Sequence, residues 1–359
     1  MLRIILFIVV NGLLGSVQAL AANHGVILQY HHVADNTPSA TTLSPELFKR
    51  QMVFLRDNGF KVWPLRQLVE HLQADKPVPD GVVVITFDDA YTDIHGVAAP
   101  ILKALEFPFT VFVSTEFVQN RQRGYMDWDQ LRALQKQGAT LGNHTHSHAH
   151  LLRQQPGERR DRWLARVKSE IQQAERLLVQ ETGEFPRYFA WPYGEADEAL
   201  IALIGKLGYL GFGQQSGAVD KNLLLSGSIP RFPFNNFYAD MTEFQQKASS
   251  LPLPLSALKA PATVWEKAAI PILSFELPEN IQRLNCYASG QGAIIMERKG
   301  GRFEVKAKQP IPVGRSRYNC TAPVNLQDEA LTLRIAPRFY WYSHQWIRMR
   351  DDGSWYPEP

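Results

Sequence analysis

Short apolar segments alternate with segments of helical periodicity between residues 26 and 231, and this alternation constrains the fold more than any other feature. The segments 82–87 and 109–113 are apolar on both faces, as strands inside a parallel sheet are. Ser44-Pro45 places an N-cap and an N1 proline at the start of a helix. About seven alternating strand–helix units predict an α/β fold, and we expect an irregular (β/α) barrel rather than an open sheet.

The pattern changes near residue 250, where a proline-rich stretch ends the helical periodicity. Beyond it, β-like runs are separated by glycine, proline and asparagine, at residues 270–277, 293–296, 303–306, 331–335 and 339–341. We expect an α/β domain over residues 22–248, a linker over 249–264 and a small C-terminal antiparallel β domain over 265–359. Aromatic residues at 339–342 and Trp346 are interpreted as the core of this sheet, the alternative being a surface that stacks on sugar rings.

The N-terminus has the pattern of a secretory signal peptide. Arg3 precedes an apolar run over residues 4–15, and Ala19-Leu20-Ala21 offers small residues for cleavage, so residues 1–21 are expected to be removed. The alternative is an uncleaved membrane anchor, for which the run is short. We expect a periplasmic or secreted protein that meets a membrane only through this segment. In such an oxidising compartment Cys286 and Cys320 should form a disulfide, the alternative being two buried free thiols.

The charge balance and a missing motif argue against two classes of partner. Lys and Arg number 38 against 35 Asp and Glu, a formal net charge of +3, whereas a nucleic-acid binder typically has a strongly basic face. The chain has no Gly-x-x-x-x-Gly-Lys phosphate loop, which is the usual signature of nucleotide binding. We therefore expect neither a nucleic acid nor a nucleotide as a partner.

Titratable side chains follow several of the predicted strands, whose carboxyl ends share one face of an α/β barrel. His31 and His32 follow the first strand, Asp88 and Asp89 follow 82–87, and histidines follow the strand near residue 141 at positions 144, 146, 148 and 150. An Asp-Asp pair alone is commonly a solvated turn, and a single histidine is commonly structural. The histidine cluster on the same face nevertheless favours a site for Zn²⁺ or a related divalent metal, with an open position for water.

Three motifs on this face resemble those of the polysaccharide deacetylases, the NodB-homology carbohydrate esterases of family 4. They are TFDD at residues 86–89, HTHSH at 144–148 and RYFAWPYG at 187–194, in the family's order. The resemblance extends over residues 26–235. The segments YHHV at 30–33 and WPYG at 191–194 are most similar to the branch that deacetylates poly-N-acetylglucosamine.

The resemblance implies a metal-dependent N-deacetylase acting on an N-acetylated amino-sugar polysaccharide, with Zn²⁺, Co²⁺ or Ni²⁺ as cofactor. The implied metal ligands are Asp89, His144 and His148. Asp88 would be the general base, with Arg187 paired to it, and the backbone N–H of Tyr193 would bind the oxyanion. The resemblance also implies exopolysaccharide export machinery as a candidate partner.

The sequence departs from the family at the general acid. The late Leu-x-His motif is missing, and the corresponding stretch, SIPRF at 228–232, has no histidine. We expect His31 or His32 to substitute, the alternative being that these histidines only pack structurally. Since neighbouring strand residues point to opposite sides, only one of them should face the site. The rival hypothesis is a non-catalytic carbohydrate-binding or scaffold protein on a degenerate barrel. The missing histidine favours this rival, whereas the intact Asp-Asp and His-x-x-x-His patterns oppose it.

Overall fold

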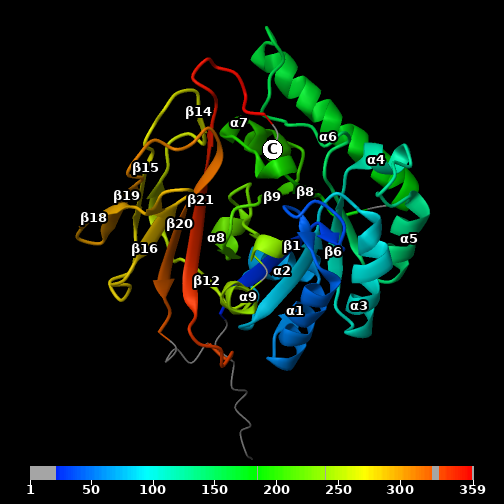
Figure 1. Cartoon of the computed structure of the whole chain (residues 1–359), viewed down its shortest axis with the longest axis horizontal. Coiled ribbons are helices and arrows are strands. Elements are labelled where there is room, and N and C mark those ends of the chain that lie inside the picture. The colour runs from blue at the N-terminus through cyan, green and yellow to red at the C-terminus, as the bar shows by residue number, and fades with distance from the viewer. Residues whose placement is uncertain (1–21, 184, 239, 326–330, 358–359) are drawn as a thin grey trace, which may run out of the picture.

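An α/β region and a C-terminal β region pack side by side (Figure 1). The computed structural model describes residues 22–183, 185–238, 240–325 and 331–357. The expected signal peptide, residues 1–21, lies outside these residues. Among the helices of the described part, none has both the length and the apolar character needed to cross a membrane.

A curled sheet of mainly parallel strands forms the centre of the α/β region. Its order is β10-β1-β5-β6-β7-β8-β9, with β11 paired to β1 and β4 to β5, and β10 is antiparallel to β1. The strands are β1 Gly25–Tyr30, β4 Lys61–Val62, β5 Val82–Phe87, β6 Phe109–Val113, β7 Thr140–Asn143, β8 Tyr188–Ala190, β9 Leu210–Phe212, β10 Ala218–Val219 and β11 Phe232–Pro233; a separate pair is β2 His32–Val33 with β3 Thr42–Leu43. The predicted α/β class and irregular barrel are confirmed, and the barrel is a curled half-barrel with β9 and β10 at its edges.

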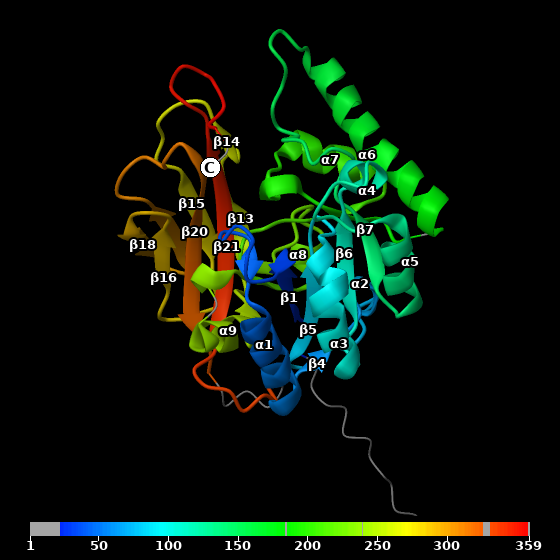
Figure 2. The same ribbon diagram turned by 45° about the vertical axis from the view of Figure 1, so that its right-hand side comes forward.

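Helices surround this sheet, and the 23-residue α6 lies on the side away from the β region (Figure 2). They are α1 Pro45–Asp57, α2 Leu65–Gln73, α3 Ala99–Ala104, α4 Thr115–Gln119, α5 Trp128–Lys136, α6 Arg160–Thr182, α7 Glu198–Lys206, α8 Lys221–Leu224 and α9 Met241–Ala248, with short turns at η1 Ile94–Ala98, η2 Pro192–Gly194 and η3 Asn236–Tyr238. The predicted N-cap of α1 is confirmed, because Ser44 Oγ accepts a hydrogen bond from Leu47 N–H at 3.3 Å. Alternate residues of β5 enter two apolar cores, one on each face of the sheet. The whole strand is therefore buried, as its uninterrupted apolar sequence predicts.

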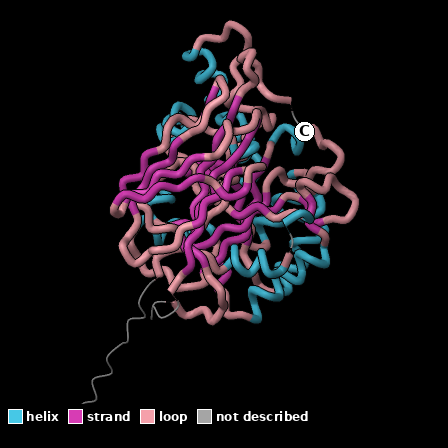
Figure 3. The backbone as a smooth tube through the Cα atoms, turned by 60° about the vertical axis from the view of Figure 1, so that its left-hand side comes forward, coloured by secondary structure: helices cyan, strands magenta, loops and turns pink. Residues whose placement is uncertain are grey.

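Two mainly antiparallel sheets form the β region (Figure 3). One has the order β12-β21-β20-β16-β17 with β14 on β21, and the other has the order β13-β15-β19-β18. The strands are β12 Leu251–Pro252, β13 Ser256–Lys259, β14 Val264–Trp265, β15 Ile272–Glu276, β16 Asn285–Ala288, β17 Gly292–Ala293, β18 Ile295–Lys299, β19 Arg302–Lys306, β20 Gly314–Pro323 and β21 Phe339–Arg348.

The β region has its own apolar core, which includes Tyr342 and Trp346. Both aromatic residues are therefore core residues, as predicted. Cys286 and Cys320 are register partners in β16 and β20, and they form the predicted disulfide. Trp341, in contrast, points away from this core towards the α/β region. It packs edge-on against Phe232 there, with 5.2 Å between ring centroids.

Two segments differ from the expectation. Residues 249–264, expected to be a linker, form β12 and β13 and begin β14. Residues 331–335, expected to be a strand, lie irregularly against the α/β region, because the Leu333 N–H donates to Asp80 Oδ2 at 2.9 Å instead of to a neighbouring strand. Arg338 donates to the same carboxylate at 2.7 and 2.8 Å. This part of the C-terminal chain is thus attached at the amino end of the barrel strands, next to the first residue of β5.

Candidate active site

Loops at the carboxyl ends of β5 and β7 bring Asp89, His144 and His148 together. Asp89 follows β5 with a left-handed φ of 72°, and His144 directly follows β7. Thr145, with φ of 68°, turns the chain, and its hydroxyl accepts a hydrogen bond from the His148 N–H at 3.0 Å. The turn returns His148 to the position of His144, so both imidazoles of the His-x-x-x-His pattern reach the same carboxylate.

The three side chains fit a divalent metal site. His144 Nε2 and His148 Nε2 lie 3.3 and 3.2 Å from Asp89 Oδ1, and the three ligand atoms are all within 4.8 Å of one another. Asp89 Oδ1 and His144 Nε2 are buried and make no hydrogen bond of acceptable geometry among the described residues, an arrangement that a shared cation would satisfy.

Both imidazoles point Nε2 at the candidate metal position, but their pKa values are shifted in opposite directions. His144 Nδ1 lies 2.8 Å from the Ala190 carbonyl, which can only accept, so Nδ1 carries a proton and Nε2 is the nitrogen directed at the site. Burial would lower the pKa of His144, but the adjacent Asp89 carboxylate raises it overall, so a bound cation would displace the Nε2 proton. Burial lowers the pKa of His148 to about 4, which leaves its imidazole neutral near pH 7.

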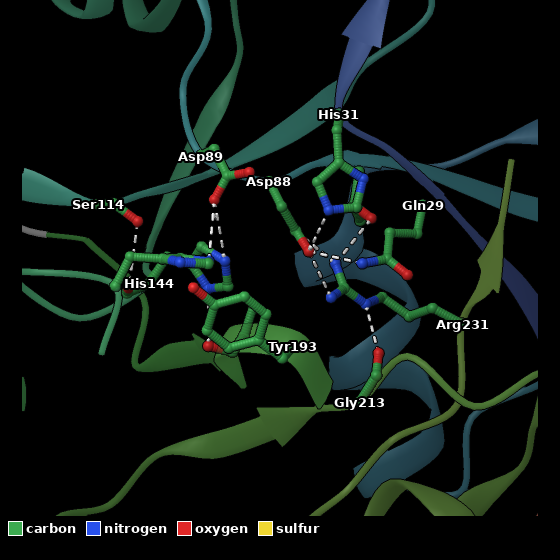
Figure 4. A network of polar contacts seen from close by, with 12 residues as sticks. Gln29, His31, Asp88, Asp89, Ser114, His144, Tyr193, Gly213 and Arg231 are labelled. Atoms are coloured by element: carbon green, nitrogen blue, oxygen red, sulfur yellow. Dashed lines mark hydrogen bonds and ion pairs between the residues drawn. The ribbon is translucent and has the colours of Figure 1, made fainter. Parts of the chain in front are cut away.

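Asp88 lies beside the metal site in a fully buried network (Figure 4). Arg231 binds its carboxylate with both terminal nitrogens, at 2.7 Å to Oδ1 and 2.8 Å to Oδ2. Gln29 Nε2 donates to Oδ2 at 2.6 Å. Burial alone would raise the pKa of Asp88, but the positive charge of Arg231 outweighs it and holds this pKa below its usual range. Asp88 is therefore an oriented anion at neutral pH.

The expected pairing of Arg187 with Asp88 is wrong. Arg187 forms an ion pair with Glu175 at 2.8 Å, and its side chain is 51% exposed. Arg187 precedes the first residue of β8, so it lies at the amino end of the sheet, whereas Asp88 lies at the carboxyl end. Sequence reasoning missed Arg231 in the stretch 228–232, because the family pattern expects a histidine there and gives no role to an arginine.

His31, and not His32, faces Asp88. His31 Nε2 lies 4.0 Å from Asp88 Oδ2, and burial lowers the pKa of His31. His32 points to the other side, where its Nδ1 is 2.6 Å from Asp93 Oδ2 and its ring stacks on Tyr91 at 3.5 Å. The alternation of side chains along an extended segment explains the difference.

Tyr193 reaches the site from the turn η2 with a left-handed backbone, φ 58° and ψ 5°. Its ring packs edge-on against His148, 4.6 Å between centroids, and stacks on His150 at 3.8 Å with only 3° between the planes. His150 is held in turn by Glu195, whose Oε2 is 2.8 Å from Nδ1. His146 points away and contacts Thr115 Oγ1 at 2.9 Å. His146 and His150 thus lie outside the ligand set, His150 supporting Tyr193 and His146 contacting α4.

Comparison with known proteins agrees with this geometry. Residues 75–212, which contain Asp88, the three candidate ligands and Tyr193, match the family model described as polysaccharide deacetylase. The α/β region belongs to the polysaccharide deacetylase family. The Asp89, His144 and His148 group fits a divalent metal site in a member of this family.

Curated relatives of this chain are distant. The poly-beta-1,6-N-acetyl-D-glucosamine N-deacetylase of Escherichia coli (strain K12) is 26% identical over 303 residues, which cover 73% of this chain and 43% of the relative. The putative polysaccharide deacetylase YxkH of Bacillus subtilis (strain 168) is 24% identical over 197 residues, 55% of this chain and 66% of the relative. The chain therefore spans less than half the length of its E. coli relative.

Solved structures share the fold of the α/β region. The deacetylase PplD of Streptococcus pyogenes, in complex with acetate, superposes with a TM-score of 0.56 at 22% identity, covering 63% of this chain and 98% of that one. IcaB from Ammonifex degensii superposes with a TM-score of 0.55 at 21% identity, covering 63% and 97%. Each superposition includes nearly all of the solved chain and under two thirds of this chain.

Proposed function

We propose that the protein is a metal-dependent N-deacetylase that hydrolyses acetamido groups of an N-acetylglucosamine polysaccharide. One observation carries the proposal: the buried, Arg231-bound carboxylate of Asp88 adjoins both the candidate metal ligands and the imidazole of His31. Amide hydrolysis needs a base, an acid and a charge-stabilising centre within reach of one carbonyl, and this arrangement supplies a candidate for each.

Asp88 is the proposed general base. A divalent cation held by Asp89, His144 and His148 would lower the pKa of a water molecule and polarise the acetamido carbonyl. Asp88, kept anionic by Arg231, would accept the proton of the attacking water. Because Arg231 and Gln29 bind both carboxylate oxygens, the orientation of this base is fixed before the substrate arrives.

His31 is the proposed general acid, and Tyr193 the proposed oxyanion donor. The leaving amine must be protonated as the carbon–nitrogen bond breaks, since an amide anion is a very poor leaving group. His31 Nε2 lies 4.0 Å from Asp88 Oδ2, and the lowered pKa of His31 makes its protonated form a stronger acid. The backbone N–H of Tyr193 would donate to the carbonyl oxygen as negative charge develops there.

The substrate we propose is poly-β-1,6-N-acetylglucosamine, with zinc as the metal and cobalt or nickel as substitutes. In support, the E. coli relative that matches 73% of this chain is named for that activity. The Staphylococcus aureus (strain MRSA252) relative, 25% identical over 186 residues, has the same name. We further propose a periplasmic or secreted location, with export machinery for the polymer as a partner, because the disulfide Cys286–Cys320 suits an oxidising compartment.

Acetate release tests the proposal directly. The protein, stripped with a chelator and reloaded with Zn²⁺, Co²⁺ or Ni²⁺, is incubated with poly-β-1,6-N-acetylglucosamine, chitin oligomers or peptidoglycan. We expect metal-dependent acetate release that is fastest from the first polymer. Asp88→Asn is the matched control, since it should retain metal and lose turnover. Polymer binding without acetate release under any metal would favour the rival, a non-catalytic carbohydrate-binding or scaffold protein.

A further inference from the structure

We propose that Arg315, which belongs to the β region, is a positioning residue for the deacetylation reaction. It would hold Tyr193 in its left-handed backbone conformation and so place the N–H assigned to the oxyanion. This inference rests on the proposed function, and it means that the β region contributes a functional residue to the active site.

The conformation of Tyr193 requires support from its surroundings. With φ 58° and ψ 5°, this residue occupies the left-handed region, which residues with a Cβ rarely adopt because it is strained. Such a conformation persists only where neighbouring groups hold it. The ring of Tyr193 is held on the barrel side by His150, in the stacked contact at 3.8 Å.

Arg315 contacts both the ring and the backbone of Tyr193. It lies in β20, opposite Ile347 of β21. Its guanidinium carbon is 5.2 Å from the ring centroid, and its Nη1 donates to the Tyr193 carbonyl at 3.4 Å. A guanidinium suits this position because it can stack on an aromatic face while donating hydrogen bonds in its own plane.

Glu195 connects the β region to the other support of Tyr193. Its side chain is fully buried, and Oε2 binds the Nδ1 of the stacked His150 at 2.8 Å. Its Oε1 accepts a hydrogen bond from the Tyr356 hydroxyl and lies 3.7 Å from Arg315 Nη1. The β region therefore acts on Tyr193 twice, directly through Arg315 and indirectly through the carboxylate that orients His150.

The test compares Arg315→Ala and Arg315→Lys in the full, zinc-loaded chain. For Arg315→Ala we expect kcat for acetate release to fall about 10- to 100-fold, somewhat less than the loss of a whole oxyanion donor. KM and bound zinc should stay within twofold of the parent. Lysine keeps the charge without the planar donor, so Arg315→Lys should recover part of kcat. A crystal structure of Arg315→Ala should show Tyr193 outside the left-handed region.

Two control variants separate positioning from a looser domain contact. Arg283→Ala removes an exposed arginine of the same β region, and Arg338→Ala breaks the buried ion pair with Asp80 at the opposite end of the contact. Both should keep the parental kcat; if Arg338→Ala does not fold, Arg338→Lys replaces it.

Three results would overturn the inference: a rise in KM alone for Arg315→Ala, an equal loss of kcat in the Arg338 variant, or an unchanged Tyr193 backbone. An inactive parent protein would refute the proposed function instead. The Tyr193 conformation in the crystal structure would still decide the role of Arg315.

Discussion

Replacing Arg231 by alanine should destabilise the protein strongly and abolish turnover. Arg231 and Asp88 both have an exposed side-chain fraction of 0%. Removing one partner of such a buried ion pair costs about 3–5 kcal/mol, because the remaining charge has no solvent to compensate it. The variant also loses the hydrogen bond from Arg231 Nε to the Gly213 carbonyl at 2.8 Å. We therefore expect the free energy of unfolding to fall by about 3 kcal/mol, the lower end of this range.

The same change should disable the proposed base. Without the charge of Arg231, burial is free to raise the pKa of Asp88, so the carboxyl group takes up a proton and can no longer accept one from water. This protonation limits the loss of stability but not the loss of activity. We expect turnover to fall at least about 100-fold, in the range of a missing general base.

Arg187→Ala is the matched comparison, because the resemblance to the family pointed to that arginine. Its ion pair with Glu175 is half exposed, and such pairs contribute about 0–1 kcal/mol. Urea unfolding followed by circular dichroism, with acetate release measured on the same samples, gives both quantities. If the two variants had equal unfolding free energies, or if Arg231→Ala retained turnover, the assignment of Arg231 as the partner of Asp88 would be refuted.

Three further predictions concern the ligands, the acid and the domain contact. His148→Ala should lose bound metal and acetate release together, and full metal occupancy by elemental analysis would remove this residue from the ligand set. His31→Ala should lose about 10²–10⁴ in turnover with metal retained, whereas His32→Ala should mainly lower stability; equal turnover in both would place the acid elsewhere. Burial would raise the pKa of Asp80, but the hydrogen bonds from Arg338 lower it overall. The stabilisation from this pair is thus complete above the unfolded pKa of about 3.9 and is lost as pH falls through the lower folded value. Unfolding free energy should therefore fall more steeply below about pH 4 in the parent than in Arg338→Ala, and parallel curves would contradict this.

The parts of the site that sequence could predict are those that follow a recognisable strand. His144 comes directly after β7 and Asp89 is the second residue after β5, and parallel topology puts such residues at the same end of the sheet. Side-chain alternation predicted that only one of His31 and His32 faces the site, and the structure identifies it as His31. These inferences need only the local pattern and the direction of the strands.

The parts that sequence missed depend on pairings too short to leave a pattern. Arg231 is 143 residues from Asp88, and it is brought there by the two-residue strand β11, which pairs with β1. The two-residue strands β12 and β14 are likewise too short to show the alternation of apolar and polar residues that identifies a strand. Their segment was therefore expected to be a linker. Arg315 could not be predicted at all, because its contact with Tyr193 spans two regions whose packing no local signal encodes.

The attachment of the C-terminal chain along the barrel has a consequence for folding autonomy. Leu333 and Ile335 complete one apolar core of the α/β region, and Ile347 and Tyr356 complete another together with Trp163. Between these points the ten residues of β21 extend over about 33 Å, so they bridge the barrel from one end of its strands to the other. A fragment cut at residue 248 would expose these surfaces, and we expect it to aggregate rather than fold. We therefore expect the cooperative folding unit to extend beyond the limits of the family match, 75–212, and to include the C-terminal β region.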